Sequence, residues 1–231
     1  MSAAIPADVR AALSGPHNHP VMTIAALYVD AARGPYAHLA SVECWDAARD
    51  ARGYAGPHAV VSHPPCGPWS RLRHMCGPDL LSQADLGPLS VAQVRAWGGV
   101  VEHPADSKLW RHLNLPKPGE LPDAHGGYTL AVEQWWWGHR AVKPTWLYIV
   151  GIDPRDVPPL PTPTTARPPS GRARGVGDSN RSMLERLPRT QRHLTPPAFA
   201  AWLLALARRA TTPPRGWSRG WSRNDPTPTI C

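Results

Sequence analysis

The feature that most constrains the fold of this chain is a short apolar run that ends near a pair of prolines. Residues 59–61 read Ala-Val-Val, and the segment Pro64-Pro65-Cys66 follows shortly after them. A short run of small and β-branched apolar residues is typical of a buried strand, and proline cannot donate a hydrogen bond to a neighbouring strand. The sequence therefore predicts a strand that delivers Cys66 on a stiff turn, where open α/β sheets place their reactive groups.

Strand-like and helix-like segments alternate along the rest of the chain. Besides the strand over 58–61, we predict strands over 23–29, 41–45, 100–101, 128–134 and 145–150, and helices over 80–97, 106–112 and 196–209. Within the helix over 80–97, the pair Gly87-Pro88 predicts an interruption, and the pair Gly98-Gly99 predicts its end. Alternation of this kind favours a layered α/β sheet.

Proline usage marks the ends of the compact part of the chain. The 231 residues include 29 prolines, and this length suffices for one substantial domain with extensions. We predict a leader over 1–20, an α/β domain over 21–151, a Pro-rich linker or reduced recognition segment over 152–181, a helix that packs back on the domain over 182–210, and a basic tail over 211–231. The tail repeats Arg-Gly-Trp-Ser from Arg215 and from Arg219, a composition suited to stacking on bases and contact with phosphates.

The charge of the chain favours a polyanionic partner. The formal net charge is +8; nucleic acid is the simplest such partner, and arginine enrichment in a GC-rich genome is the alternative source of the charge. The four cysteines form no Cys-x-x-Cys pair, and no apolar run approaches the roughly 20 residues of a membrane span. We expect a cytoplasmic protein with reduced thiols, with DNA as its partner and with neither a membrane anchor nor a metal.

Three short motifs between residues 59 and 151 resemble those of the DNA cytosine-5 methyltransferase family. They are Pro64-Pro65-Cys66, similar to the family's Pro-Cys nucleophile loop; Val101-Glu102-His103, similar to its Glu-Asn-Val motif with His103 replacing the asparagine; and Val132-Glu133-Gln134 with Arg140 and residues 147–151, similar to its Gln…Arg motif and the strand that follows. The resemblance implies a Rossmann-like, methyltransferase-type sheet that is mostly parallel, with flanking helices and a reduced or absent target-recognition domain. It also implies short or relaxed sequence specificity, in a compact protein of the phage or prophage type.

The same resemblance implies covalent chemistry at a cytosine that is flipped out of the duplex. The thiolate of Cys66 would add to C6 of the ring, and C5, now enamine-like, would accept a one-carbon unit. The attack calls for a Cys66 thiol with a lowered pKa. It also calls for a Glu102 carboxyl that burial keeps protonated, so that it donates to N3. Arg140 would hold the nucleotide phosphate or orient the ring.

The resemblance further implies S-adenosylmethionine as the donor, although only one glycine remains of the family's glycine-rich turn. The cofactor would lie against Asp30 at a strand end, Gly34, Glu43 at the end of the next strand, and Pro65. Substrate and DNA contacts would come from Ser70, Arg71, Gln134, His139, Lys143, Arg172 and Arg174. Two alternatives stay open: an enzyme with the same chemistry but another donor or a nucleotide substrate, and a non-catalytic nucleic-acid-binding module.

Overall fold

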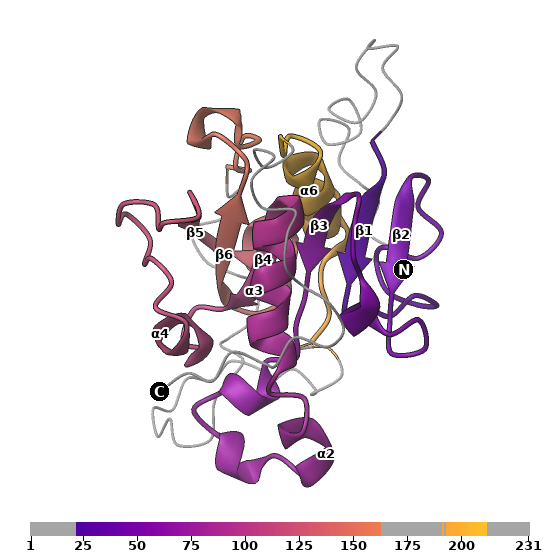
Figure 1. Ribbon diagram of the computed structural model, residues 1–231, viewed down its shortest axis with the longest axis vertical. Coiled ribbons are helices and arrows are strands. Elements are labelled where there is room, and N and C mark those ends of the chain that lie inside the picture. The colour runs from indigo at the N-terminus through magenta and orange to yellow at the C-terminus, as the bar shows by residue number, and fades with distance from the viewer. Residues whose placement is uncertain (1–21, 163–190, 192, 212–231) are drawn as a thin grey trace.

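A computed structural model describes residues 22–162, 191 and 193–211 of the chain (Figure 1). The predicted leader, most of the Pro-rich segment over 152–181 and nearly all of the basic tail lie outside these residues. The arginines predicted to contact DNA from those segments, Arg172, Arg174, Arg215 and Arg219, lie outside them as well.

The described residues form a mixed six-stranded sheet with helices on its two faces. The strands are β1 (Ile24–Leu27), β2 (Val42–Trp45), β3 (Ala59–Ser62), β4 (Gly99–Pro104), β5 (Tyr128–Glu133) and β6 (Pro144–Val150), in the order β2-β1-β3-β4-β6-β5. The pairs β1/β2, β1/β3 and β3/β4 are parallel, whereas β6 runs antiparallel to both β4 and β5. The α/β class is confirmed, but the sheet is mixed where we expected a mostly parallel one. The reason is that β5 and β6 are neighbours joined by a short connection, whereas parallel neighbours need a long crossover.

The helical segments are mostly short. They are η1 (Ala51–Gly53), η2 (Gly67–Trp69), η3 (Arg73–Met75), α2 (Pro78–Leu81), α3 (Leu86–Trp97), α4 (Leu109–His112), η4 (Gln134–Trp137), η5 (Pro154–Asp156) and α6 (Pro197–Ala207). The helix expected over 80–97 is divided between α2 and α3. Gly87-Pro88 does not interrupt α3 but lies in its first turn. Backbone N–H groups in the first turn have no acceptor within the helix, so a proline there costs no hydrogen bond. None of these described helices is long and apolar enough to cross a membrane.

Two apolar layers hold the helices to the sheet. Side chains of successive strand residues point to opposite faces. Accordingly, Val60 and Val101 pack with Val94 of α3 in one cluster, whereas Val61 packs with Leu203 of α6 in the other. Helices α3 and α6 thus cover opposite faces of the sheet (Figure 1).

The parallel strands bring their carboxyl ends to one edge of the sheet. Ser62, the last residue of β3, pairs with Leu27 of β1 on one side and with Val101 of β4 on the other. His63 comes directly after Ser62, and Glu102 comes directly after its partner Val101. His63 and Glu102 are therefore level with each other along the two strands. The strand order turns outward in both directions from β1, so the carboxyl ends of β1 and β3 form the switch point at which open sheets bind ligands.

Candidate functional site

Cys66 lies on a tight turn just beyond the carboxyl end of β3. Its carbonyl oxygen accepts a hydrogen bond of 3.1 Å from Trp69 N–H, which closes the single turn of η2. Gly67 is needed here, because a Cβ at this position would come within 2.4 Å of the Leu80 side chain in α2. The Cys66 thiol is partly buried. Proline, the short helix and the packing of α2 together hold the thiol in one place.

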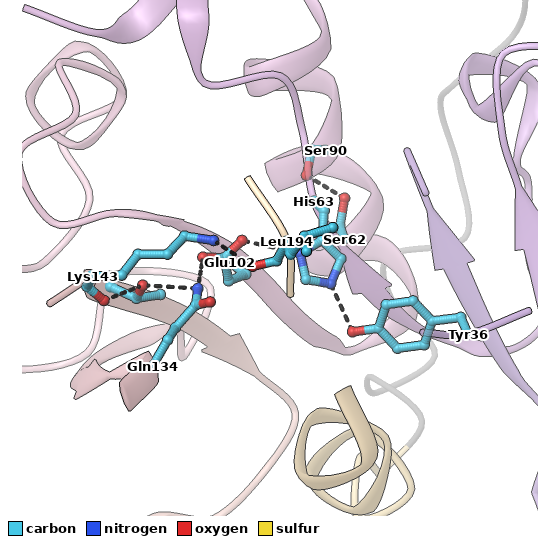
Figure 2. A network of polar contacts seen from close by, with 9 residues as sticks. Tyr36, Ser62, His63, Ser90, Glu102, Gln134, Lys143 and Leu194 are labelled. Carbon is cyan, nitrogen blue, oxygen red and sulfur yellow. Dashed lines mark hydrogen bonds and ion pairs between the residues drawn. The ribbon is translucent and has the colours of Figure 1, made fainter. Parts of the chain in front are cut away.

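Glu102 is the buried carboxylate of the site. It lies on β4, beside the end of β3, and its side chain is 10% exposed. Figure 2 shows both of its oxygens in hydrogen bonds: Oε1 accepts from Gln134 Nε2 at 2.8 Å, and Oε2 lies 3.0 Å from His63 Nδ1. The carboxylate is therefore fixed in orientation from two sides.

The ionisation of Glu102 differs from the sequence expectation. Burial raises the pKa of Glu102, but the hydrogen bond from His63 and the positive charge of Lys143 outweigh burial and lower that pKa from 4.5 to about 2. The expectation of a carboxyl kept protonated by burial is therefore wrong for the resting site. His63 follows β3 and Lys143 precedes β6, so neither belongs to the motif that contains Glu102.

The Cys66 thiol also departs from the expected state. Burial raises the pKa of this thiol above its ordinary value, the negative charge of Glu102 raises it further, and the charge of Lys143 opposes both. At rest the thiol is protonated, rather than ionised as a lowered pKa would make it. Because the Glu102 charge is one of the causes, neutralising Glu102 would favour the thiolate.

A hydrogen-bonded chain continues from Glu102 through His63 to Tyr36. The Tyr36 hydroxyl, from the turn after β1, lies 2.7 Å from His63 Nε2. Tyr36 is buried, and burial holds its pKa well above the ordinary value, so the hydroxyl keeps its proton. Sequence reasoning missed both residues. His63 precedes the Pro-Pro pair and could have been noticed there, whereas nothing in the sequence marks Tyr36.

Gln134 is fully buried, and its amide orientation is determined by its neighbours. Thr145 Oγ1 donates to the Lys143 carbonyl oxygen, so it can only accept from Gln134 Nε2, at 3.1 Å. Glu102 also only accepts from that nitrogen while it is ionised. Gln134, predicted from the third motif as a substrate-binding residue, therefore acts in this structure as a rigid donor to Glu102.

Lys143, Arg140 and His139, which were also predicted to act on the substrate, differ in their relation to Glu102 and Cys66. Lys143 Nζ donates to the Leu194 carbonyl oxygen at 3.4 Å, and its charge acts on both Glu102 and Cys66. Arg140 is exposed and donates to Gln191 Oε1 at 2.9 Å. His139 is buried, and its Nδ1 accepts from Ala141 N–H within its own turn, so the expected contact with substrate stays a prediction.

Ser70 and Arg71 follow η2, on the segment that leads toward α2. Ser70 donates its backbone N–H to the Gly67 carbonyl oxygen, and its side chain is partly buried. Arg71 is exposed. Both residues thus lie close in sequence to Cys66, on the outer side of its turn.

His103 replaces the asparagine of the second motif and takes no charge at neutral pH. It is fully buried, and burial lowers its pKa to about 4. Its ring meets the Trp110 ring edge-on, with centroids 6.2 Å apart. We therefore describe it as a packed neutral imidazole behind the Cys66 turn.

The predicted cofactor residues lie around the ends of β1 and β2. Asp30 is exposed, and its Oδ1 accepts from Ala32 N–H and Arg33 N–H, so it closes its own turn. Gly34 belongs to the same turn, since a Cβ there would lie 2.4 Å from the Asp30 carbonyl oxygen. β2 ends at Trp45, as does the strand predicted over 41–45, so Glu43 lies within this strand and not at its end.

The side chain of Glu43 faces basic groups on the edge of the sheet. It lies 3.3 Å from Arg49 Nη2 and 3.7 Å from His58 Nε2, and it is 36% exposed. Pro65 lies in the Cys66 turn itself and is partly buried.

Among the described residues, no group of three or more His, Cys, Asp or Glu could hold a metal ion. In comparisons with known proteins, no family model and no curated protein matches this chain.

Proposed function

We propose that the chain is a DNA cytosine-5 methyltransferase-like enzyme with short or relaxed sequence specificity. One observation carries this proposal: Glu102 of the second motif is hydrogen-bonded at 2.8 Å to Gln134 of the third, and its charge acts on the Cys66 thiol of the first. Segments far apart along the chain thus supply a nucleophile, a carboxylate and an amide to one end of the sheet. This is the set of groups that addition to a pyrimidine ring requires.

The proposed reaction begins with the addition of the Cys66 thiolate to C6. The S–C6 bond forms, the C5=C6 electron pair moves to C4–C5, and the C4=N3 pair takes up a proton at N3. C5 of the resulting enamine then forms a bond to the one-carbon unit as the bond between that unit and its donor breaks. Water takes the C5 proton, the S–C6 pair returns to sulfur, and the N3 proton returns to Glu102, which restores the ring.

S-adenosylmethionine supplies the methyl group in this proposal when it is bound. Asp30 closes its own turn and Glu43 faces Arg49 and His58, so Glu43 would exchange these contacts to accept from ribose hydroxyls. The switch point of the strand order at the carboxyl ends of β1 and β3 supports a ligand at this position. Arg71, Lys143 and the basic composition of the chain support DNA as the partner.

The test is exchange of the C5 hydrogen, which depends on addition at C6 and needs no methyl donor. DNA labelled with tritium at cytosine C5 should release tritium to water in the presence of the protein. Cys66→Ser should lower that release by orders of magnitude, because a serine hydroxyl does not ionise near neutral pH. Cys76→Ser is the matched control, since Cys76 donates to the Gly67 carbonyl oxygen and serine keeps that donor.

DNA that carries 5-fluorocytosine gives a second readout. Fluorine does not leave C5 as a proton does, so the wild-type protein should remain covalently attached to the DNA. Equal tritium release from wild type and Cys66→Ser, or no release from either, would contradict the proposed function.

A further inference from the structure

The resting site contains a carboxylate where the proposed reaction needs an acid. Addition at C6 requires a proton at N3, yet Glu102 is ionised in this structure. The proton must therefore reach Glu102 from a neighbour during the reaction. The hydrogen-bond partners of Glu102 among the described residues show which neighbour this is.

Only one of the two hydrogen-bond donors to Glu102 can give up a proton. Gln134 donates an amide N–H to Oε1, and an amide does not ionise near neutral pH. His63 faces Oε2 through Nδ1 at 3.0 Å, and imidazole is the side chain that gains and loses a proton in this range. Lys143 donates to a backbone carbonyl oxygen, and no hydrogen bond joins it to the carboxylate in the described part of the chain.

Tyr36 allows His63 to hold either one or two protons without losing a hydrogen bond. When His63 is neutral with its proton on Nδ1, the Tyr36 hydroxyl donates to Nε2, 2.7 Å away. When His63 is an imidazolium, Nε2–H donates and the hydroxyl oxygen accepts. The hydroxyl only has to rotate, because burial keeps Tyr36 protonated in both states.

We propose that His63 is a positioning residue that relays a proton to Glu102, as an element of the function proposed above. The Nδ1–H bond of the imidazolium breaks, its electron pair stays on Nδ1, and an O–H bond forms at Glu102 Oε2. The ion pair thereby becomes a neutral imidazole and a neutral carboxylic acid. The new O–H turns about its C–O bond and gives its proton to N3. When the ring is restored, the N3 proton returns through Glu102 to His63 Nδ1, which restores the ion pair for the next addition.

The relay also acts on the nucleophile. The charge of Glu102 is one of the causes that hold the Cys66 thiol in its protonated form. Proton transfer from His63 removes that charge, so the acid and the thiolate become available together. One proton movement thus prepares both groups that the addition needs.

The titratable and charged groups around the hydrogen bonds that join Glu102, His63 and Tyr36 come from five strands or from the segments beside them. They are Tyr36 after β1, Cys44 on β2, Cys66 after β3, Glu102 and His103 on β4, and Lys143 before β6. Tyr36 stays protonated and His103 stays neutral at neutral pH. His63 and Cys66 are therefore the two groups whose ionisation should control the rate.

The experiment is the pH profile of tritium exchange for wild type, His63→Gln and the control His38→Gln. Glutamine can still donate an N–H to Glu102, so His63→Gln keeps the positioning contact and removes only the ionisable ring. Wild type should give a bell-shaped profile: the rate rises as the Cys66 thiol ionises and falls as His63 loses its proton. His63→Gln should be slower by about 10²- to 10⁴-fold at the maximum and should lose the falling limb. His38, exposed in the turn after β1, should leave the profile unchanged.

A purely structural role of His63 would lower the rate at every pH and leave the falling limb in place, and that result would overturn the relay. If the melting temperature of His63→Gln is far below that of wild type, tritium exchange is measured instead for His63→Ala with added imidazole. Recovery of exchange with imidazole supports the relay, and no recovery overturns it. Exchange by wild type with an unchanged profile in His63→Gln refutes the relay alone, whereas no exchange by wild type refutes the proposed function and the relay with it.

Discussion

Glu102→Gln should destabilise the protein by an amount that depends on pH. The fall of the Glu102 pKa from 4.5 to about 2 corresponds to roughly 3 kcal/mol of stability at neutral pH, at about 1.4 kcal/mol per unit. The sign follows from the direction of the shift. Because the pKa is lower in the folded state, this stability is fully present above about pH 4.5 and is lost as the pH falls toward 2.

The variant also introduces a mismatch at the same place. Gln134 and His63 both direct an N–H toward the carboxylate, whereas glutamine at position 102 offers one oxygen and one N–H. One of the two donors would then face another donor in a buried site. This clash has the same order of magnitude as the lost carboxylate interaction, because an unmet buried polar group costs about 1 to 3 kcal/mol.

Urea unfolding of wild type and Glu102→Gln at several pH values measures the effect. The part of this difference that depends on pH should be about 3 kcal/mol at about pH 6 and should fall to about half of that by about pH 3, and the clash adds about 1 to 3 kcal/mol at every pH. Subtracting the two curves removes the contribution of every other carboxyl group. Glu120→Gln is the matched control, since Glu120 is exposed and pairs only with Lys117, so its effect should stay within about 0.5 kcal/mol. A difference that does not change with pH would mean that Glu102 is protonated in the folded protein, and the account of the site would fail.

Two further predictions concern regions away from the site. Asp123→Asn should lower the free energy of unfolding in urea by about 2 kcal/mol, because Asp123 accepts from Arg95 at 2.8 Å and from Tyr148 at 2.6 Å. The same variant should leave tritium exchange unchanged, and slower exchange would show that this network reaches the site. Binding to DNA should weaken linearly with salt on logarithmic axes, with a slope of roughly 0.9 per phosphate contact, and deletion of residues 211–231 should reduce that slope equally on unrelated sequences; a loss confined to one sequence would point to base contacts instead.

The positions of Cys66 and Glu102 could be predicted in part, because apolar runs mark the strands in the sequence. The end of β3 lies close to its predicted place, and parallel neighbours bring their ends together. The strand predicted over 100–101 was too short: β4 continues to Pro104, so Glu102 lies within it. The ionisation of both residues could not be predicted. It depends on His63 and Lys143, whose distances from the carboxylate follow from strand register and from the antiparallel entry of β6. A motif records which residues are present but not which charges surround them.

The surroundings of Glu43 and His139 show the same limit. The strand predicted over 41–45 matches β2, but its sequence does not show that Glu43 faces Arg49 and His58. Nor does the sequence show that the turn between β5 and β6 buries His139. Both side-chain environments are defined only in the folded chain.

The docking of α6 determines when the site can form during synthesis of the chain. Phe199, Leu203 and Leu206 fill the same apolar layer as Ile24 and Val61. Until those C-terminal residues have left the ribosome, the strands that carry Cys66 and Glu102 have one uncovered apolar face. A nascent chain that stops before α6 therefore exposes that face to other chains, and it aggregates before the thiol and the carboxylate are held together.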